Sequence, residues 1–229
     1  MPNGLSSAAS ALRYWERRQE IASNNLANAS TDGFKAERVF ATMLGDALPV
    51  AKTSTDTTAG SLRQTGNPLD VAIKNDAFLV VSTPNGERFS RGGSLQVDTA
   101  RRLVDGGGHP VLGAKGPITL PQGDVTIDAK GTISVNGATV DKLRLERAAD
   151  PKSLAHEGGT LLVPDAGRKA VPDAERAVSQ GFVEESNVNT VSSMVDMIAV
   201  QRAYASVQKA VTTMDSVRGT AVNELGKPV

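Results

Sequence analysis

The sequence contains no cysteine and carries no net charge, and each of these absences argues against a class of function. Without cysteine the chain can form neither a disulfide framework nor a thiolate metal site. Lysine and arginine together number 25, as do aspartate and glutamate, whereas nucleic-acid binders usually show a basic excess. We therefore expect no nucleic acid among the partners of this protein.

Long apolar runs and aromatic residues are also scarce. No run of about 18 apolar residues occurs, so no membrane-spanning helix is expected. The first residues lack a basic stretch followed by an apolar core, and we therefore expect no cleaved signal peptide. Aromatic residues make up 3% of the chain, too few for a wide aromatic core. We expect much of the stability to come from contacts with other chains.

Both ends of the chain carry apolar residues at the spacing of a helical stripe. Steps of three and four residues put side chains on one face of an α-helix, as in the seam of a coiled coil. The first stripe consists of Leu5, Ala8, Leu12, Trp15, Ala22 and Leu26, and the polar Gln19 occupies the one remaining position between Trp15 and Ala22. The second stripe consists of Met197, Val200, Tyr204, Val207, Val211 and Met214. Because a single amphipathic helix cannot bury its stripe alone, we predict that the two helices pair, with or without further copies.

The residues between the two stripes favour extended structure. Residues 36–69 are polar and show no period, which indicates an extended connector. From residue 70 to residue 175, apolar residues alternate with polar ones between short turns, which is typical of an all-β domain. The predicted fold is therefore α+β. An N-terminal helix (residues 1–35) and a return segment with a C-terminal helix (176–229) pair as a coiled-coil-like helical domain, with the all-β domain inserted between them.

No group of residues has the spacing of a catalytic or metal site. Gly106-Gly107-Gly108 lacks the lysine and the following helix of a phosphate loop, so we predict a hairpin or bulge there. The two histidines, His109 and His156, have no second ligand at metal spacing. No nucleophile lies in a recognisable elbow or near a paired base. We therefore predict no enzyme activity, no metal, no cofactor and no small-molecule substrate.

The end of the first predicted helix is rich in asparagine, at Asn24, Asn25 and Asn28. One interpretation is an ordinary helix end, where turn residues are common. The other is that Asn25 and Asn28, which flank the stripe, place buried amides against a partner and fix its register. The second predicted helix has candidate N-caps at Ser186, Asn187 and Asn189.

Two separated motifs carry a resemblance to a known family. They are SNNLANASTDGFK (residues 23–35) and GFVEESNVNTVSSMVDMIAVQRAY (residues 181–204), and they resemble the two terminal motifs of the bacterial flagellar rod and hook family. Between them, PLDVAIKNDAFLVV, RGGSLQVD and GHPVLGAKGPITLPQGDVTIDAKGTIS resemble the β domain of the same family. Within this family the chain is most like a proximal rod protein of the flagellar basal body. Members often have glycine, at turn or bulge positions, where this chain has Asn75, Ala77 and Arg101.

The resemblance implies a structural role. It implies an axial subunit of the flagellar rod, a torque-transmitting tube that spans the periplasm, with terminal helices lining the inner wall and the β domain facing outward. The implied partners are copies of the chain, other flagellar rod proteins and the flagellar type III export apparatus, which exports subunits without a cleaved signal. The resemblance also implies a joint between the terminal segments that includes Asn24, Asn25, Asn28, Gly33, Phe34, Ser186, Asn187 and Asn189.

Two alternatives stay open at this point. Within the family, the chain could be a distal rod protein or another rod or hook paralogue. From a different class, it could be a secreted, β-rich, adhesin-like protein, which would require terminal helices that stay paired within one monomer.

Overall fold

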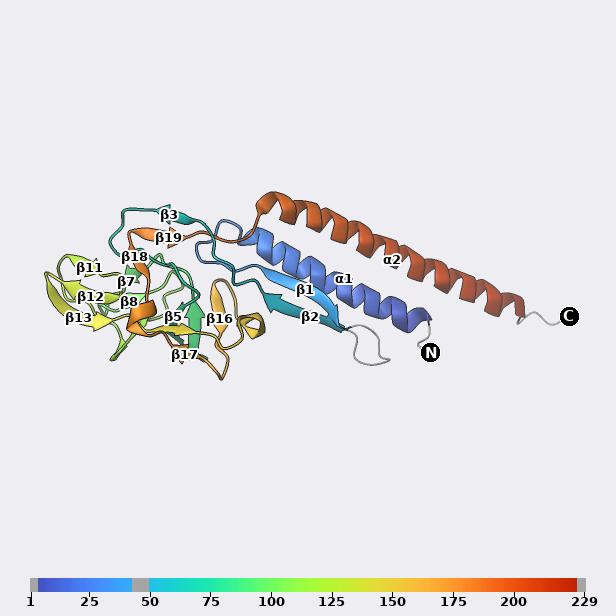
Figure 1. The fold of residues 1–229 in the computed structure, drawn as a ribbon. Helices are drawn as coiled ribbons and strands as arrows, with labels where there is room; N and C mark the ends of the chain where they lie inside the picture. Colours follow the sequence, from blue (N-terminus) through green and yellow to red (C-terminus); the bar gives the residue numbers. More distant parts are fainter. Residues whose placement is uncertain (1–3, 43–49, 226–229) are drawn as a thin grey trace. The chain divides into compact units, whose positions relative to one another are not determined.

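A computed structural model describes residues 4–42 and 50–225 of the chain (Figure 1). The described residues form two long α-helices, one at each end of the sequence, with strands between them. Helix α1 spans Gly4–Ala27 and helix α2 spans Thr190–Leu225. The predicted α+β class is confirmed. No helix within the described residues is long and apolar enough to cross a bilayer.

The contacts divide the chain into two compact units, which we describe separately. The helical unit contains both helices and residues 38–53. The β unit contains residues 27–37 and 54–188. Within the helical unit, α1 and α2 contact each other.

The buried face of α1 includes residues beyond the predicted stripe. Stripe residues with described side chains are all partly buried: Ala8, Leu12, Trp15, Ala22 and Leu26. The side chain of Leu5 lies outside the described part of the helix. Ile21, which is not in the stripe, is fully buried, whereas Glu16 and Glu20 are exposed. Helix α1 therefore buries a face that is wider than a narrow coiled-coil seam.

Helix α2 begins at an asparagine cap and buries one narrow face. The side chain of Asn189 accepts a hydrogen bond from the backbone N–H of Ser192 at 3.0 Å, which satisfies a donor that the first helical turn leaves open. Of the predicted stripe, Val200 is fully buried, Met214 is 43% exposed, and the others are partly buried: Met197, Tyr204, Val207 and Val211.

The described residues of the segment predicted as an extended connector include three strands. Strands β1 (Glu37–Thr42) and β2 (Val50–Thr55) form a two-stranded sheet. Strand β3 (Leu62–Gln64) pairs antiparallel with β19 (Phe182–Glu184), which follows the all-β segment in the sequence. This last pairing brings the two ends of the β unit together.

A six-stranded antiparallel sheet forms the centre of the β unit, in the order β15-β16-β6-β5-β14-β17. The β unit also contains a separate three-stranded sheet, β11-β12-β13, and several two-stranded ladders. The strands between β3 and β19 are β4 (Val71–Ile73), β5 (Phe78–Thr83), β6 (Gly86–Ser90), β7 (Gln96–Val97), β8 (Leu103–Val104), β9 (Leu112–Gly113), β10 (Gly116–Pro117), β11 (Val125–Ile127), β12 (Thr132–Val135), β13 (Ala138–Lys142), β14 (Leu145–Arg147), β15 (Ala155–His156), β16 (Leu161–Val163), β17 (Lys169–Ala170) and β18 (Val178–Gln180). Short 3₁₀ turns span Pro151–Ser153 and Asp173–Glu175.

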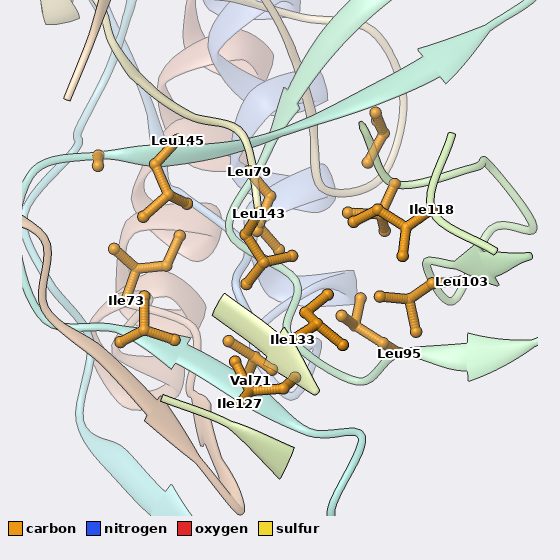
Figure 2. Packing of buried hydrophobic residues seen from close by; sticks show 14 of the residues in the cluster. Val71, Ile73, Leu79, Leu95, Leu103, Ile118, Ile127, Ile133, Leu143 and Leu145 are labelled. Carbon is orange, nitrogen blue, oxygen red and sulfur yellow. The ribbon is translucent and has the colours of Figure 1, made fainter. Parts of the chain in front are cut away.

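Strand β5 is buried on both faces because its alternate residues contact two different apolar clusters. Leu79 and Val81 belong to a large aliphatic cluster, which Figure 2 shows in detail. Phe78 and Val80 belong to a smaller cluster, in which the ring of Phe78 stacks on that of Phe89 at a centroid distance of 5.1 Å. The buried residues of the large cluster are all aliphatic, as the low aromatic content of the chain predicts. The two-residue period of β5 therefore produces two cores, one on each face of the sheet.

Arg101 adopts a backbone conformation that normally requires glycine. Its φ of 62° lies in the left-handed region, and its N–H closes the turn by donating to the carbonyl oxygen of Asp98 at 3.0 Å. Its guanidinium donates to the carbonyl oxygens of Leu120 at 3.0 Å and Pro121 at 2.6 Å. The side chain therefore compensates locally for the backbone strain.

We expect Arg101→Gly to be more stable than Arg101→Ala, by about 1 kcal/mol. Both variants lose the same guanidinium hydrogen bonds, but only glycine adopts the left-handed conformation without strain. Urea unfolding of the two variants measures the difference. Equal stabilities would show that the turn readjusts to accommodate alanine.

Candidate functional site

Segments from three parts of the chain meet within the β unit at residues 33–36, 56–60 and 184–187; together with Arg91 we call them the junction. The backbone N–H of Gly33 donates to the carbonyl oxygen of Glu184 at 2.6 Å, and that of Asp56 donates to the carbonyl oxygen of Ala36 at 2.7 Å. The N–H of Glu185 donates to the carbonyl oxygen of Ser61 at 2.8 Å. The residues that follow α1 are therefore hydrogen-bonded to residues that precede α2.

Three charged side chains are buried together at the centre of the junction. Lys35 and Glu184 are each 1% exposed, and Arg91 is 5% exposed. The ammonium of Lys35 contacts one carboxylate oxygen of Glu184 at 2.5 Å, and the guanidinium of Arg91 contacts the other at 2.6 Å. Glu184 thus bridges the two cations.

Backbone carbonyl groups accept further hydrogen bonds from Lys35 and Arg91. Lys35 donates to the carbonyl oxygen of Thr58 at 2.6 Å. Arg91 donates to the carbonyl oxygens of Asn75 at 2.5 Å and Ile73 at 3.1 Å, and also to that of Ala77. A buried charge is tolerated only when it is paired and fully hydrogen-bonded. The guanidinium of Arg91 meets that condition, and the ammonium of Lys35 is paired with Glu184 and hydrogen-bonded to Thr58.

Burial lowers the pKa of the Lys35 ammonium below its ordinary value, although the hydrogen bond and the charge of Glu184 act in the opposite direction. A lowered pKa means that folding disfavours the charged form of this lysine. The ion pair therefore offsets only part of the cost of burying the ammonium. We infer that the main role of the network is to specify which segments pair, and that its net contribution to stability is small.

The side-chain amide of Asn187 joins the same segments. Its oxygen accepts from the N–H of Ala36 at 2.7 Å, and its nitrogen donates to the carbonyl oxygens of Asp56 at 2.7 Å and Thr58 at 3.1 Å. The N–H of Asn187 donates to the carbonyl oxygen of Phe34 at 3.4 Å. One amide thus satisfies backbone groups from both chain segments that it contacts.

Gly33 is required by both its conformation and its surroundings. Its φ is 75°, and a Cβ atom at this position would lie 2.3 Å from the backbone carbonyl carbon of Arg91 and the nitrogen of Gly92. The next residue, Phe34, is buried, and its ring lies 5.4 Å from that of His156. Glycine therefore lets the chain pass close to the β unit and insert Phe34.

The structure places the predicted joint residues in three different settings. Gly33, Phe34, Ser186 and Asn187 lie in the junction. Ser186 accepts a hydrogen bond from the N–H of Val188, and Asn189 caps α2. Asn24 and Asn25 lie in the last turns of α1. Asn28 follows the helix and accepts hydrogen bonds from Thr31 through both its side chain and its carbonyl oxygen.

A hollow of about 650 Å³ lies elsewhere in the β unit. Its lining includes Asp32, Asp105, His109 and Glu157. Two of these groups contact other side chains of the same chain. Asp105 contacts the ring of His109 at 3.1 Å, and Asp32 contacts Arg63 at 2.9 Å. Residues 106–108 form a turn between strands β8 and β9. A hydrogen bond from the N–H of Gly108 to the carbonyl oxygen of Asp105 closes this turn, which agrees with the predicted hairpin. The described residues contain no cluster of three or more potential metal ligands.

The chain matches three family models. The model described as "Flagella basal body rod protein" matches residues 5–35, "Flagellar hook protein FlgE/F/G D1 domain" matches residues 72–135, and "Flagellar basal body rod FlgEFG protein C-terminal" matches residues 179–224. A full-length relative, flagellar basal-body rod protein FlgF of Rhizobium meliloti, is 34% identical over 99% of both chains. The chain belongs to the flagellar basal body rod protein family.

Further members of the rod family extend this comparison. FlgF of Escherichia coli is 35% identical over 96% of this chain and 97% of its own length. Flagellar basal-body rod protein FlgG of Borreliella burgdorferi is 29% identical over 97% of this chain and 98% of its own length. The resemblance predicted from the two terminal motifs is therefore confirmed along the whole chain.

Each of the three rod-family segments contributes one member of the buried charge network. Lys35 ends the first segment, Arg91 lies in the second, and Glu184 lies in the third. Sequence reasoning missed these residues, although all three lie in the motifs GFK, RGGS and GFVEE. The available signal was a charged residue close to a glycine and a phenylalanine in each terminal motif. Such a position differs from that of a charged residue on the solvent-exposed face of a helix, and it could have indicated a buried charge.

Proposed function

We propose that the chain is a structural axial subunit of the bacterial flagellar basal-body rod, of the proximal-rod type. Its full-length similarity to proteins named as basal-body rod proteins supports this role. The proximal type is supported by identity: the FlgF-named relatives are 34% and 35% identical, and the FlgG-named relative is 29% identical. A distal rod role and an adhesin-like role are less well supported. The proposal assigns the chain no catalytic role.

The observation that carries the proposal is a second apolar face on α2. Val191, Met194, Val195 and Ile198 are between 49% and 73% exposed. Their spacing places them on one side of the helix, which we call the outer face of α2. Apolar residues gathered on an exposed helix face indicate a protein–protein contact. Because another face, which includes Val200, is already buried, the outer face is available for a different helix.

In the proposed rod, the outer face of α2 packs against terminal helices of neighbouring subunits. The paired helices of residues 1–35 and 176–229 form the coiled-coil-like core of a torque-transmitting tube, and the β domain of residues 70–175 projects from it. The partners are copies of this chain and other rod proteins. The flagellar type III apparatus exports the subunit without a cleaved signal, and the assembled rod spans the periplasm.

Ile198→Asp tests this proposal. A charge buried in a helix–helix contact without a partner costs several kcal/mol, so we expect at least a tenfold loss of the subunit from purified basal bodies, together with loss of swimming. Gln208→Asp, at an exposed polar position of the same helix, is the matched control and should assemble normally. The amount of each variant exported and the urea midpoint of its β unit should equal those of the wild type. Normal incorporation of Ile198→Asp would refute the proposed contact.

A further inference from the structure

His156 contacts the junction from strand β15, and one of its two ring nitrogens is buried without a hydrogen-bond partner in the described part of the chain. Its ring packs against the buried ring of Phe34, at a centroid distance of 5.4 Å and an interplanar angle of 35°. Its Nε2 atom is buried and has no hydrogen-bond partner within the described part of the chain. A neutral imidazole can leave one nitrogen unprotonated, whereas a charged imidazolium needs an acceptor for each N–H. The site therefore suits the neutral ring.

We propose that His156 is a proton-sensitive latch, whose neutral ring holds Phe34 in the junction and whose protonation loosens the junction in acid. This inference goes beyond the structural role of the rod subunit, because it makes the joint between the terminal segments depend on pH. The consequence for assembly is that acid would lower the incorporation of the subunit without changing its synthesis.

The charges around His156 come from two segments. From the residues after α1, the ammonium of Lys35 is held by Glu184, and the carboxylate of Glu37 favours the imidazolium. From the turn after β15, Glu157 is held by Arg88 and by Asn85. Strand β16, which pairs with β15, consists of leucine and valine and adds no charge.

Burial is the largest influence and lowers the pKa of His156, while Glu37 and backbone hydrogen bonds with Gly159 and Lys35 oppose it. The folded protein therefore binds this proton less tightly than the unfolded chain does. The stabilising effect of the neutral ring is complete above the unfolded pKa of about 6.5 and is lost progressively as the pH falls below it. A decrease from pH 7.5 to pH 5.5 should therefore loosen the junction.

Only two histidines occur in the chain, so the test can be specific. Proton NMR of the full chain should show two titrating imidazole signals, which His109→Gln assigns by removing one. We expect the His156 signal to titrate below pH 6.5. We also expect the urea midpoint of the wild type to be lower at pH 5.5 than at pH 7.5. His156→Phe, which keeps a ring beside Phe34 but cannot titrate, should remove at least half of that difference.

His109→Gln is the matched control and should keep the difference in urea midpoint. A wild type with equal midpoints at the two pH values would overturn the proposal, as would a His156→Phe variant that keeps the full difference. If His156→Phe does not fold, the NMR titration of the wild type still decides the question, because a His156 pKa at or above 6.5 contradicts a ring held neutral by the fold.

Discussion

Replacing Glu184 by alanine is expected to destabilise the β unit by about 3–5 kcal/mol, the range measured when one partner of a buried ion pair is removed. The change removes the carboxylate that pairs with both the buried ammonium of Lys35 and the buried guanidinium of Arg91. It also removes the acceptor for the N–H of Gly60, which lies 2.9 Å from the carboxylate. Urea or thermal unfolding of the full chain measures the loss, and the amount of subunit recovered in basal bodies should fall with it.

The neighbouring carboxylate provides the matched control. Glu185 has a side chain that is 45% exposed and contacts Arg63 at 3.3 Å. Because exposed ion pairs contribute little, Glu185→Ala should leave the unfolding midpoint almost unchanged. If Glu184→Ala were as stable as Glu185→Ala, the buried network would have no role in holding the junction together.

A double variant measures how much of the stability lost in Glu184→Ala comes from the buried ammonium of Lys35, which has lost its paired carboxylate. Lys35→Met in the Glu184→Ala background removes one of the two cations and supplies an apolar side chain of similar length. We expect it to recover part of the stability lost in Glu184→Ala, because an apolar group needs no counter-charge. No recovery would mean that the main loss comes from the guanidinium of Arg91 or from the backbone donor of Gly60.

The terminal helices could be predicted from the sequence because their signal is local. Steps of three and four residues placed Val200 in a stripe, and the structure buries it. The outer face of α2 was not predicted, because a single stripe was sought and Val195 lies outside it. Burial of Ile21 was missed for the same reason, since a wide face and a narrow seam share most of their residues.

The pairing of distant segments could not be predicted from either segment alone. Lys35 and Glu184 are 149 residues apart, and each is an ordinary charged residue until the other is beside it. Strand β2 was missed for a different reason. Its sequence, Val50–Thr55, has polar and small side chains, so no apolar alternation marks it, although threonine favours strands.

Gly33→Ala is expected to disrupt the junction more than an equal change at a glycine of the same conformation. Gly33 and Gly66 have φ angles of 75° and 74°, so alanine meets the same backbone strain at both, about 1–2 kcal/mol. At Gly66 no atom lies within 4 Å of the added Cβ, whereas at Gly33 the backbone of Arg91 and Gly92 lies 2.3 Å away. Backbone cannot rotate aside as a side chain can, so the chain after α1 must move.

Comparison of the two alanine variants therefore separates the cost of the steric clash with the backbone of Arg91 and Gly92 from the cost of the backbone strain. We expect Gly33→Ala to lose about 1–3 kcal/mol more than Gly66→Ala, the usual cost of forcing extra atoms into a packed site. Amide exchange should locate the loss, with faster exchange at Phe34 and Lys35 in Gly33→Ala and wild-type rates there in Gly66→Ala. Equal unfolding midpoints for the two variants would mean that residues 33–36 can withdraw from the β unit at no cost. In that case Gly33 would serve only the turn after α1, because the junction would not depend on the close passage of the chain.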